Sequence, residues 1–345
     1  MDDTLRQRRA TPGLGAGNKI PADPLSQVGF ISKGDTKLLD PKAQEQYYNK
    51  IVDRYVQFCN THSGSLDAAF GSLPRNRSED PAKNPPAPIP VISPVTSASS
   101  AERPRSQSPK PLSKSTSLTG SKSTASSEQL PPAEELSILL LSFRKLREAM
   151  LATSSKTSVV FSQHVHMFCI RVAILAQHPP SYYPPLQRLL NNLHSHSHPL
   201  DSSDLREFTT YLILDYACRQ GDMPAAYELR AHSRVAFGYS NTSVDRILRA
   251  IMHDDWVSFW RTKRNESEYT KALLNWAGDS IRRRALKAVG RAYLSVDVNY
   301  LVECCAGENE GWTWETLVEH EGLGWKRDGD KVIIRVRRPN VGMRK

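Results

Sequence analysis

The chain has no aromatic residue between Ser72 and Pro132, and all six of its tryptophans lie beyond position 255. The same stretch holds 12 prolines and 15 serines, with lysines and arginines scattered between them. Because such a segment cannot bury enough apolar area to offset the entropy lost on ordering, we predict that residues 72–132 form a disordered linker. Its Ser-Pro pairs at Ser93 and Ser108 are candidate phosphorylation sites, and incidental serines in a serine-rich linker explain them equally well.

Sequence signatures of catalysis are also absent. The chain has no glycine-rich phosphate loop, no GxSxG and no HExxH. The alternating His194, His196 and His198 have no cysteine or carboxylate at ligand spacing, so we prefer a solvated loop to a metal site. Cys304 and His320 match a nucleophile and its base in residue type alone, and a buried structural thiol is the better interpretation. We therefore expect a protein that is not an enzyme and that uses no cofactor, metal or small-molecule substrate.

The cysteines, five in all, show no CxxC spacing, and their odd number favours free thiols in a reducing compartment. The N-terminal residues lack the apolar stretch of a signal peptide, and no apolar run approaches the roughly 20 residues of a membrane span. We therefore expect an intracellular protein that is neither secreted nor attached to a membrane.

The first 71 residues are expected to form an N-terminal tail with one amphipathic helix. Tyr47, Ile51, Tyr55 and Phe58 recur at spacings of four, four and three residues, which places them on one face of a helix over residues 43–58. This helix could dock onto the main domain or bind a partner as a lone helix.

Beyond Pro132 the apolar residues follow a helical period. Leu136, Leu139, Phe143 and Leu146 begin a stripe that is typical of an amphipathic helix. Further helices are predicted over 157–177, 184–194, 203–219, 222–236, 242–262 and 265–277. Breaks are predicted at Pro179-Pro180, Gly221-Asp222 and Gly238, and a capping box at Asp204 and Glu207. Antiparallel helices joined by short loops predict a stacked helical array over residues 133–278.

The end of the chain predicts a different module. A helix over 279–294 is followed by two short helices, over 296–305 and 313–320, and then by two strand-like segments around Asp328-Gly329. Asp-Gly favours a hairpin turn because both residue types tolerate positive φ. This is the order of a winged helix, predicted over residues 279–338 and followed by a basic tail at 339–345. The expected fold class is therefore mostly α, a helical array that ends in a winged helix with a short β-hairpin.

The net charge of +10 and the pI of about 9.4 favour acidic partners, nucleic acid first. Basic residues gather on the outer side of the helix at 279–294 and around the predicted hairpin, where a salt-sensitive phosphate-binding surface is expected. An ordinary solvated charge face explains the same pattern equally well. The candidate nucleic-acid-binding residues are Arg283, Arg284, Lys287, Arg291, Lys326, Arg327, Lys331, Arg335, Arg337 and Arg338.

Two groups of large apolar residues are expected to be structural core. They are Phe208, Tyr211, Leu214, Trp256, Phe259 and Trp260. The first group lies on one predicted helix, and the second shares a helix face through i, i+3 and i+4 spacing. Because three aromatic rings on one face need a partner surface, we expect the second group to hold the array to the winged helix rather than to bind a ligand.

Three segments resemble motifs of a known family. EFTTYLIL (207–214) resembles its EFxxYxIL helix, IMHDDWVSFW (251–260) its ALGNYxRFF segment, and RRRALKAVGRAY (282–293) its RxxALKAM helix. Over about residues 133–338 the chain thus resembles the suppressor-of-actin/GANP family of PCI-like proteins, in its leukocyte-receptor-cluster branch. Proteasome lid subunit twelve, signalosome subunit eight and initiation factor three subunit k share the pattern.

The sequence departs from the family pattern at Leu212, Asp254 and Ser258, and the cysteine- and proline-rich signature expected upstream is missing. The resemblance implies a PCI-type array that pairs with another PCI-type protein and contacts RNA through its winged helix, in nuclear mRNA processing or export. The alternative is a structural subunit of a lid, signalosome or initiation-factor complex, nuclear or cytoplasmic, without nucleic-acid binding.

Overall fold

The computed structural model describes residues 25, 36–74, 130–307 and 310–335. They are mostly helical, with one small antiparallel sheet near the C-terminus, which confirms the predicted fold class. By its internal contacts the chain falls into two units, residues 1–75 with 132–345 and residues 76–131. The second unit lies wholly within the bounds of the predicted linker, residues 72–132. Residues 75–129, Arg337, Arg338 and the predicted basic tail lie outside the described residues.

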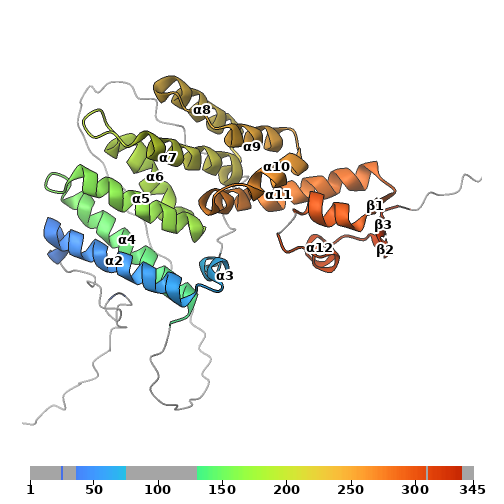
Figure 1. The fold of residues 1–345 in the computed structure, drawn as a ribbon, viewed down its shortest axis with the longest axis horizontal. Helices are drawn as coiled ribbons and strands as arrows, with labels where there is room; N and C mark the ends of the chain where they lie inside the picture. The colour runs from blue at the N-terminus through green and yellow to red at the C-terminus, as the bar shows by residue number, and fades with distance from the viewer. Residues whose placement is uncertain (1–24, 26–35, 75–129, 308–309, 336–345) are drawn as a thin grey trace, which may run out of the picture. The chain divides into compact units, whose positions relative to one another are not determined.

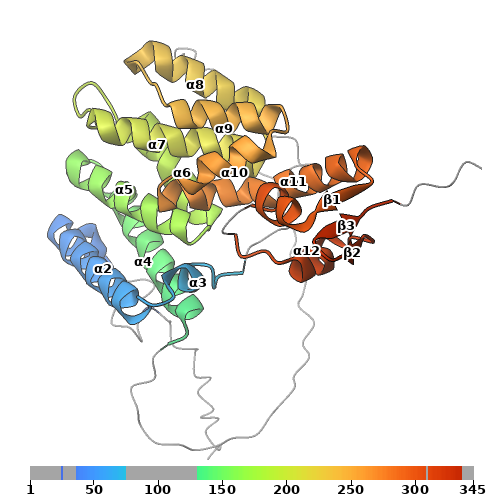
Figure 2. The same cartoon turned by 45° about the vertical axis from the view of Figure 1, so that its right-hand side comes forward.

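The N-terminal helix α2 (Pro41–Thr61) packs along α4 (Pro132–Ala152), and both views show the two side by side (Figures 1 and 2). Three residues of its predicted stripe, Tyr47, Ile51 and Phe58, are buried. A short 3-10 turn, η1 (Thr36–Leu39), precedes α2, and the short helix α3 (Leu66–Phe70) follows it. The helix near the start of the chain therefore docks onto the main domain, which is the first of its two predicted alternatives.

A buried polar contact fixes α2 on α4. Gln44 is fully buried, and its amide nitrogen donates to the Leu38 carbonyl and to the Thr153 hydroxyl, both at 2.8 Å. The Thr157 hydroxyl donates to the Gln44 amide oxygen at 3.0 Å. Because a buried amide without partners destabilises the fold, these three bonds favour a single register of α2 against α4.

The helical array continues from α4 through six more α-helices. They are α5 (Val159–Leu175), α6 (Pro179–Arg188), α7 (Ser202–Leu214), α8 (Met223–Phe237), α9 (Thr242–Met252) and α10 (Trp256–Arg264). Single π-helical turns extend α6 and α7 at their C-terminal ends, η2 (Leu189–Leu193) and η3 (Asp215–Gln220). Neighbouring helices in the chain contact each other, as α5 and α6, α7 and α8, and α9 and α10 do.

Three local predictions for the array were wrong. The predicted break is present between α5 and α6, but α6 begins at Pro179 and not at residue 184, because proline is tolerated at the first helical positions. The predicted helix 242–262 is divided at Asp254, which has a φ of +55°, and Asp255 then caps α10 through the Ser258 N–H. The predicted capping box is absent, since Glu207 and Asp204 both bind Arg171 of α5.

Helix α11 (Glu268–Ala292) passes from the array into the winged helix (Figure 1). The sequence predicted two helices here, and the structure joins them into one helix of 25 residues. Gly278, at the predicted boundary, is helical, and a Cβ atom there would lie 3.4 Å from the Trp260 ring. The glycine therefore allows a close approach of the indole and does not end the helix.

After α11 the chain forms β1 (Ser295–Asp297), the π-helical turn η4 (Tyr300–Cys305), α12 (Trp314–Glu321), β2 (Lys326–Asp328) and β3 (Lys331–Ile333). The strand order is β1-β3-β2, all antiparallel. Val289 of α11, Leu317 of α12 and Val332 of β3 meet in one buried cluster. The predicted winged helix is thus present, with one strand, β1, that the sequence analysis missed.

The wing hairpin closes one residue later than predicted. Asp328 pairs with Lys331, which leaves Gly329 and Asp330 as the two-residue loop. Gly329 has a φ of +60°, whereas Asp330 has a negative φ. A glycine with positive φ at the first of the two loop positions is the pattern of a type II′ turn. The glycine, rather than the Asp-Gly pair, sets the turn.

We predict that Gln44→Ala lowers the free energy of unfolding by about 1–3 kcal/mol, because it removes three buried hydrogen bonds, although the Thr153 and Thr157 hydroxyls still bond to each other. Urea denaturation of the full chain measures this. Gln46→Ala is the matched control, since Gln46 is exposed on the same helix, and it should change stability by less than about 0.5 kcal/mol. Equal effects of the two variants would contradict the role assigned to Gln44.

Candidate nucleic-acid interface

Trp260 of α10 joins the array to the winged helix. Its indole N–H donates to the Cys305 carbonyl at 3.2 Å, and its ring packs edge-on against the fully buried Phe259, with centroids 5.1 Å apart. Gly307 has a φ of +106°, and a Cβ atom there would lie 2.9 Å from the Trp260 ring. Trp256, half-buried, packs against the core of the winged helix. The second predicted aromatic group therefore forms the junction between the two parts.

A buried ion pair completes this junction. Lys263 is 4% exposed, and its Nζ lies 2.6 Å from Glu310 Oε1 and 5.1 Å from the centroid of the Trp260 ring. Removing Glu310 would take away one partner of a desolvated ammonium, which is destabilising, whereas Glu310 itself is 31% exposed and would stay partly solvated without Lys263. The winged helix is thus held to α10 by an aromatic ring, a hydrogen bond and an ion pair, in addition to the continuous α11.

The first predicted core group is also buried, on α7. Phe208, Tyr211 and Leu214 are each at most 3% exposed. The Tyr211 hydroxyl donates to Glu207, whose carboxylate also accepts from the Arg171 guanidinium. Burial and the bond to Glu207 raise the pKa of Tyr211 well above its usual value. These contacts make the EFTTYLIL segment a packing element of the array.

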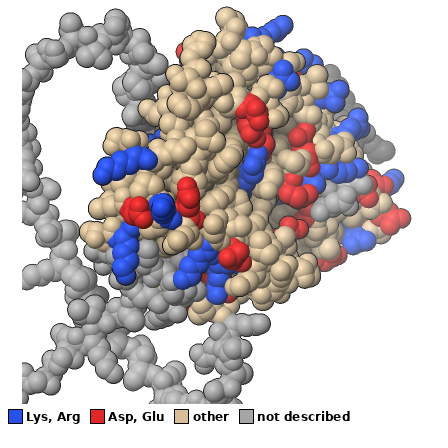
Figure 3. Space-filling model, turned by 60° about the vertical axis from the view of Figure 1, so that its left-hand side comes forward, with Lys and Arg blue, Asp and Glu red and all other residues tan. Residues whose placement is uncertain are grey.

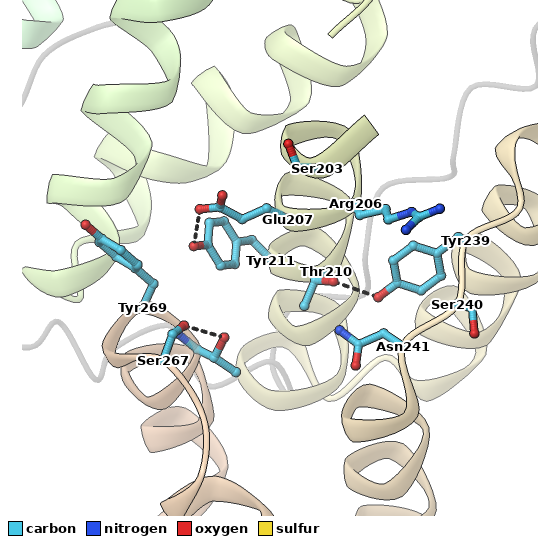
Figure 4. A pocket seen from close by; sticks show the side chains of 11 residues that line it. Ser203, Arg206, Glu207, Thr210, Tyr211, Tyr239, Ser240, Asn241, Ser267 and Tyr269 are labelled. Atoms are coloured by element: carbon cyan, nitrogen blue, oxygen red, sulfur yellow. Dashed lines mark hydrogen bonds between the residues drawn. The ribbon is translucent and has the colours of Figure 1, made fainter. Parts of the chain in front are cut away.

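The sequence analysis missed a pocket of about 470 Å³ beside α7. Figure 4 shows side chains from α7, from the loop before α9 and from the start of α11 around it. The Thr210 and Tyr239 hydroxyls are 2.7 Å apart, and burial raises the pKa of Tyr239 to about 12. Tyr211 and Tyr239 therefore stay protonated near neutral pH and can exchange hydrogen bonds but not act as bases.

The outer side of α11 carries three of the candidate basic residues. Arg283, Lys287 and Arg291 follow each other at intervals of four and are all exposed, which forms one outward stripe. Arg283 is 61% exposed, and its Nε is 3.5 Å from Glu321 Oε2. Within the part of the chain that the structure describes, Lys287 and Arg291 form no ion pair. We call Arg283, Lys287 and Arg291 the α11 stripe.

Arg284 does not belong to this stripe. Its Nη1 lies 2.6 Å from Asp254 Oδ1 and 3.5 Å from the Ile251 carbonyl oxygen. The guanidinium therefore binds the turn between α9 and α10 and supports the junction. Arg284 was a phosphate-binding candidate because it is basic, but its guanidinium is engaged by Asp254 and the Ile251 carbonyl.

Two candidates on the wing, Lys331 and Arg327, have acidic neighbours, whereas the exposed Lys326 pairs in the sheet with Ile333. Lys331 lies between Asp297 of β1 and Asp328 of β2, its partners in the sheet register. Opposite charges on directly paired strand residues attract each other across the sheet. Arg327 points to Glu315 at 3.2 Å and donates to the Gly329 carbonyl at 2.9 Å. The wing therefore offers less net positive charge than its lysines and arginine suggest.

Helix α12 occupies the position that reads DNA in helix-turn-helix proteins, and it is acidic. It contains Glu315, Glu319 and Glu321 and no lysine or arginine. Glu315 is 71% exposed but already pairs with Arg327, so the exposed Glu319 is the carboxylate that would face a phosphate backbone without an ion-pair partner among the described residues. Between Asp279 and Arg335 nine basic residues stand against ten acidic ones. Insertion of α12 into a major groove is thus electrostatically disfavoured.

Arg335 extends the α11 stripe at its C-terminal end. Its Nη2 donates to the Arg291 carbonyl at 2.5 Å, and its backbone N–H donates to the Leu294 carbonyl at 3.2 Å. Arg335 therefore lies beside the last turn of α11. On the face of the array shown in Figure 3, by contrast, basic and acidic side chains are interspersed. The structure thus brings together four of the ten candidates, Arg283, Lys287, Arg291 and Arg335.

No family model matches this chain. A search of curated proteins finds no match either. Among the described residues, no group of three or more histidine, cysteine, aspartate or glutamate side chains could hold a metal ion. Nor is any helix in that part of the chain both long and apolar enough to cross a membrane. His320 binds Glu321 at 3.1 Å and lies against the Trp312 ring.

Gly307→Ala should test the junction. A Cβ atom at Gly307 would meet the Trp260 ring and the Glu310 side chain, so we expect a loss of about 1–3 kcal/mol from overpacking beyond the cost of positive φ. Gly311→Ala is the control, because Gly311 has a φ of +76° but open space around it. Thermal and denaturant unfolding of both variants compare the two costs. If Gly311→Ala is as damaging as Gly307→Ala, the close packing against Trp260 does not stabilise the fold.

Proposed function

We propose that the chain is a non-catalytic scaffold or adaptor that contacts nucleic acid through the α11 stripe. The observation that supports this best is the position of the stripe on a helix shared by the array and the winged helix. Cations on a rigid element are already in place before a ligand binds, so less side-chain and backbone freedom is lost on binding. In this proposal the array provides the surface for another PCI-type protein or for a multi-subunit complex.

The geometry of the stripe suits a phosphate backbone. Four residues along an α-helix advance by about 6 Å, so Arg283, Lys287 and Arg291 form a row of regularly spaced cations. Such a row recognises charge and spacing but not sequence, which is the behaviour of backbone contacts. We therefore propose RNA binding that is weakly sequence-dependent and strongly salt-dependent.

The process is proposed from the resemblance of residues 133–338 to the suppressor-of-actin/GANP family. Members of that family pair with other PCI proteins in nuclear mRNA processing and export. We accordingly propose a nuclear role in mRNA processing or export. Affinity purification from cells with mass spectrometry would test it, because the subunits that copurify would be mRNA-processing factors.

A second candidate is a structural subunit of a lid-, signalosome- or initiation-factor-type complex that binds no nucleic acid. The acidic α12 and the balanced wing favour it, since both reduce the attraction of the winged helix for phosphate. In that case the α11 stripe would serve an acidic protein surface or stay solvated.

The two candidates differ in salt-dependent RNA binding by the full chain. We expect Lys287→Glu with Arg291→Glu to weaken binding to all sequences alike and to lower the log–log salt slope by about 0.7 for each lost phosphate contact. Lys42→Glu with Lys156→Glu is the control, since it makes the same charge change at exposed sites on α2 and after α4. Fluorescence anisotropy across a salt series measures both. If the wild-type protein binds no RNA at low salt, the RNA-binding scaffold is rejected and the structural subunit becomes the better candidate.

A further inference from the structure

Two large apolar side chains are exposed next to each other where α11 ends. Tyr293 is 51% and Leu294 48% exposed, although most residues of this size in the described part of the chain are buried. Tyr293 has extended backbone angles, φ −113° and ψ 152°, and leads directly into β1. The ring is therefore carried on a well-defined backbone between a helix and a strand.

Basic groups flank this pair. Arg291 precedes it by two residues, and the Arg335 backbone N–H donates to the Leu294 carbonyl at 3.2 Å. The Arg335 guanidinium also donates a hydrogen bond from Nη2 to the Arg291 carbonyl. Its other N–H groups remain available to donate to a ligand. Within the described residues neither arginine forms an ion pair with a carboxylate. The exposed Tyr293 thus lies two residues after Arg291 and next to Leu294, to which the Arg335 backbone is bonded, and within the described residues no acidic side chain neutralises either arginine.

We propose that Tyr293 is a stacking platform for an unpaired base, with Arg291 and Arg335 binding neighbouring phosphates of the same strand. The ligand class is single-stranded nucleic acid. This inference rests on the proposed function and adds the site that distinguishes a single strand from a duplex. Aromatic rings beside cationic side chains are the usual means of binding single strands without sequence preference.

A duplex does not fit the same site. Its bases are stacked on each other and paired, so an exposed ring cannot replace one of those contacts without opening the helix. The other route, insertion of α12 into a groove, is opposed by Glu315 and Glu319. The exposed ring and the acidic α12 therefore both favour binding of a single strand over a duplex.

The test uses the full chain with a fluorescent oligouridine and with an RNA duplex of the same length, measured by anisotropy. We expect the single strand to bind more tightly than the duplex. Tyr293→Ala should weaken single-strand binding roughly 5- to 150-fold, the range for loss of one stacked base. The log–log salt slope should stay unchanged, because no phosphate contact is removed. Tyr293→Phe should bind like the wild type, since it keeps the ring.

Val235→Ala is the matched control, because Val235 is an apolar side chain on α8 that is 89% exposed. It should bind like the wild type, and thermal melts should be alike for all variants. The stacking site would be overturned if Tyr293→Ala left single-strand binding unchanged, or if the duplex bound as tightly as the single strand. The proposed function would survive either result. Failure of both RNAs to bind at low salt would overturn both, and a protein ligand would then be the better occupant of the surface.

Discussion

The contact of Trp260 with the η4 turn is the constraint on which the rest of the structure depends. The indole lies against Gly278 of α11 and against Gly307 after η4, and an added Cβ atom at Gly307 would clash with the ring at 2.9 Å. Its N–H satisfies the Cys305 carbonyl, and the neighbouring Lys263 is neutralised by Glu310. Since α11 crosses this junction without a break, the array and the winged helix form one unit. The basic stripe on α11 therefore has a fixed position relative to every surface of the array.

Ion pairing, rather than net charge, decides which part of the winged helix can attract a polyanion. The charge of +10 belongs to the whole chain, whereas acidic and basic residues are nearly equal in number between Asp279 and Arg335. Asp254 engages Arg284, Glu315 engages Arg327, and aspartates flank Lys331 in the sheet. Among the described candidates, what remains is a narrow stripe along α11 that ends at an exposed tyrosine, together with Lys326 of β2. Such a surface suits a flexible single strand, which can follow a stripe, better than a rigid duplex.

Features that depend on local chemistry could be predicted from the sequence, and features that depend on distant partners could not. The hairpin was predicted because Gly329 permits its turn, and the α7 and α10 cores were predicted because their spacing is helical. The three-residue strand β1 was missed because it exists only through pairing with β3, more than thirty residues later. The separation of Arg284 from its neighbours depends on an ion pair with Asp254, a residue of a different turn. The hydroxyl-lined pocket likewise combines three segments far apart in the chain.

The central claim is that single-stranded RNA binds at the C-terminal end of α11. Ultraviolet crosslinking of the full chain to RNA containing 4-thiouridine, followed by mass spectrometry of the crosslinked peptides, tests it most directly. The account predicts crosslinks at residues 287–294 and at Arg335, with Tyr293 among them, and none in α12. Crosslinks confined to α12 or to the basic segments at 76–131 and 336–345 would contradict it.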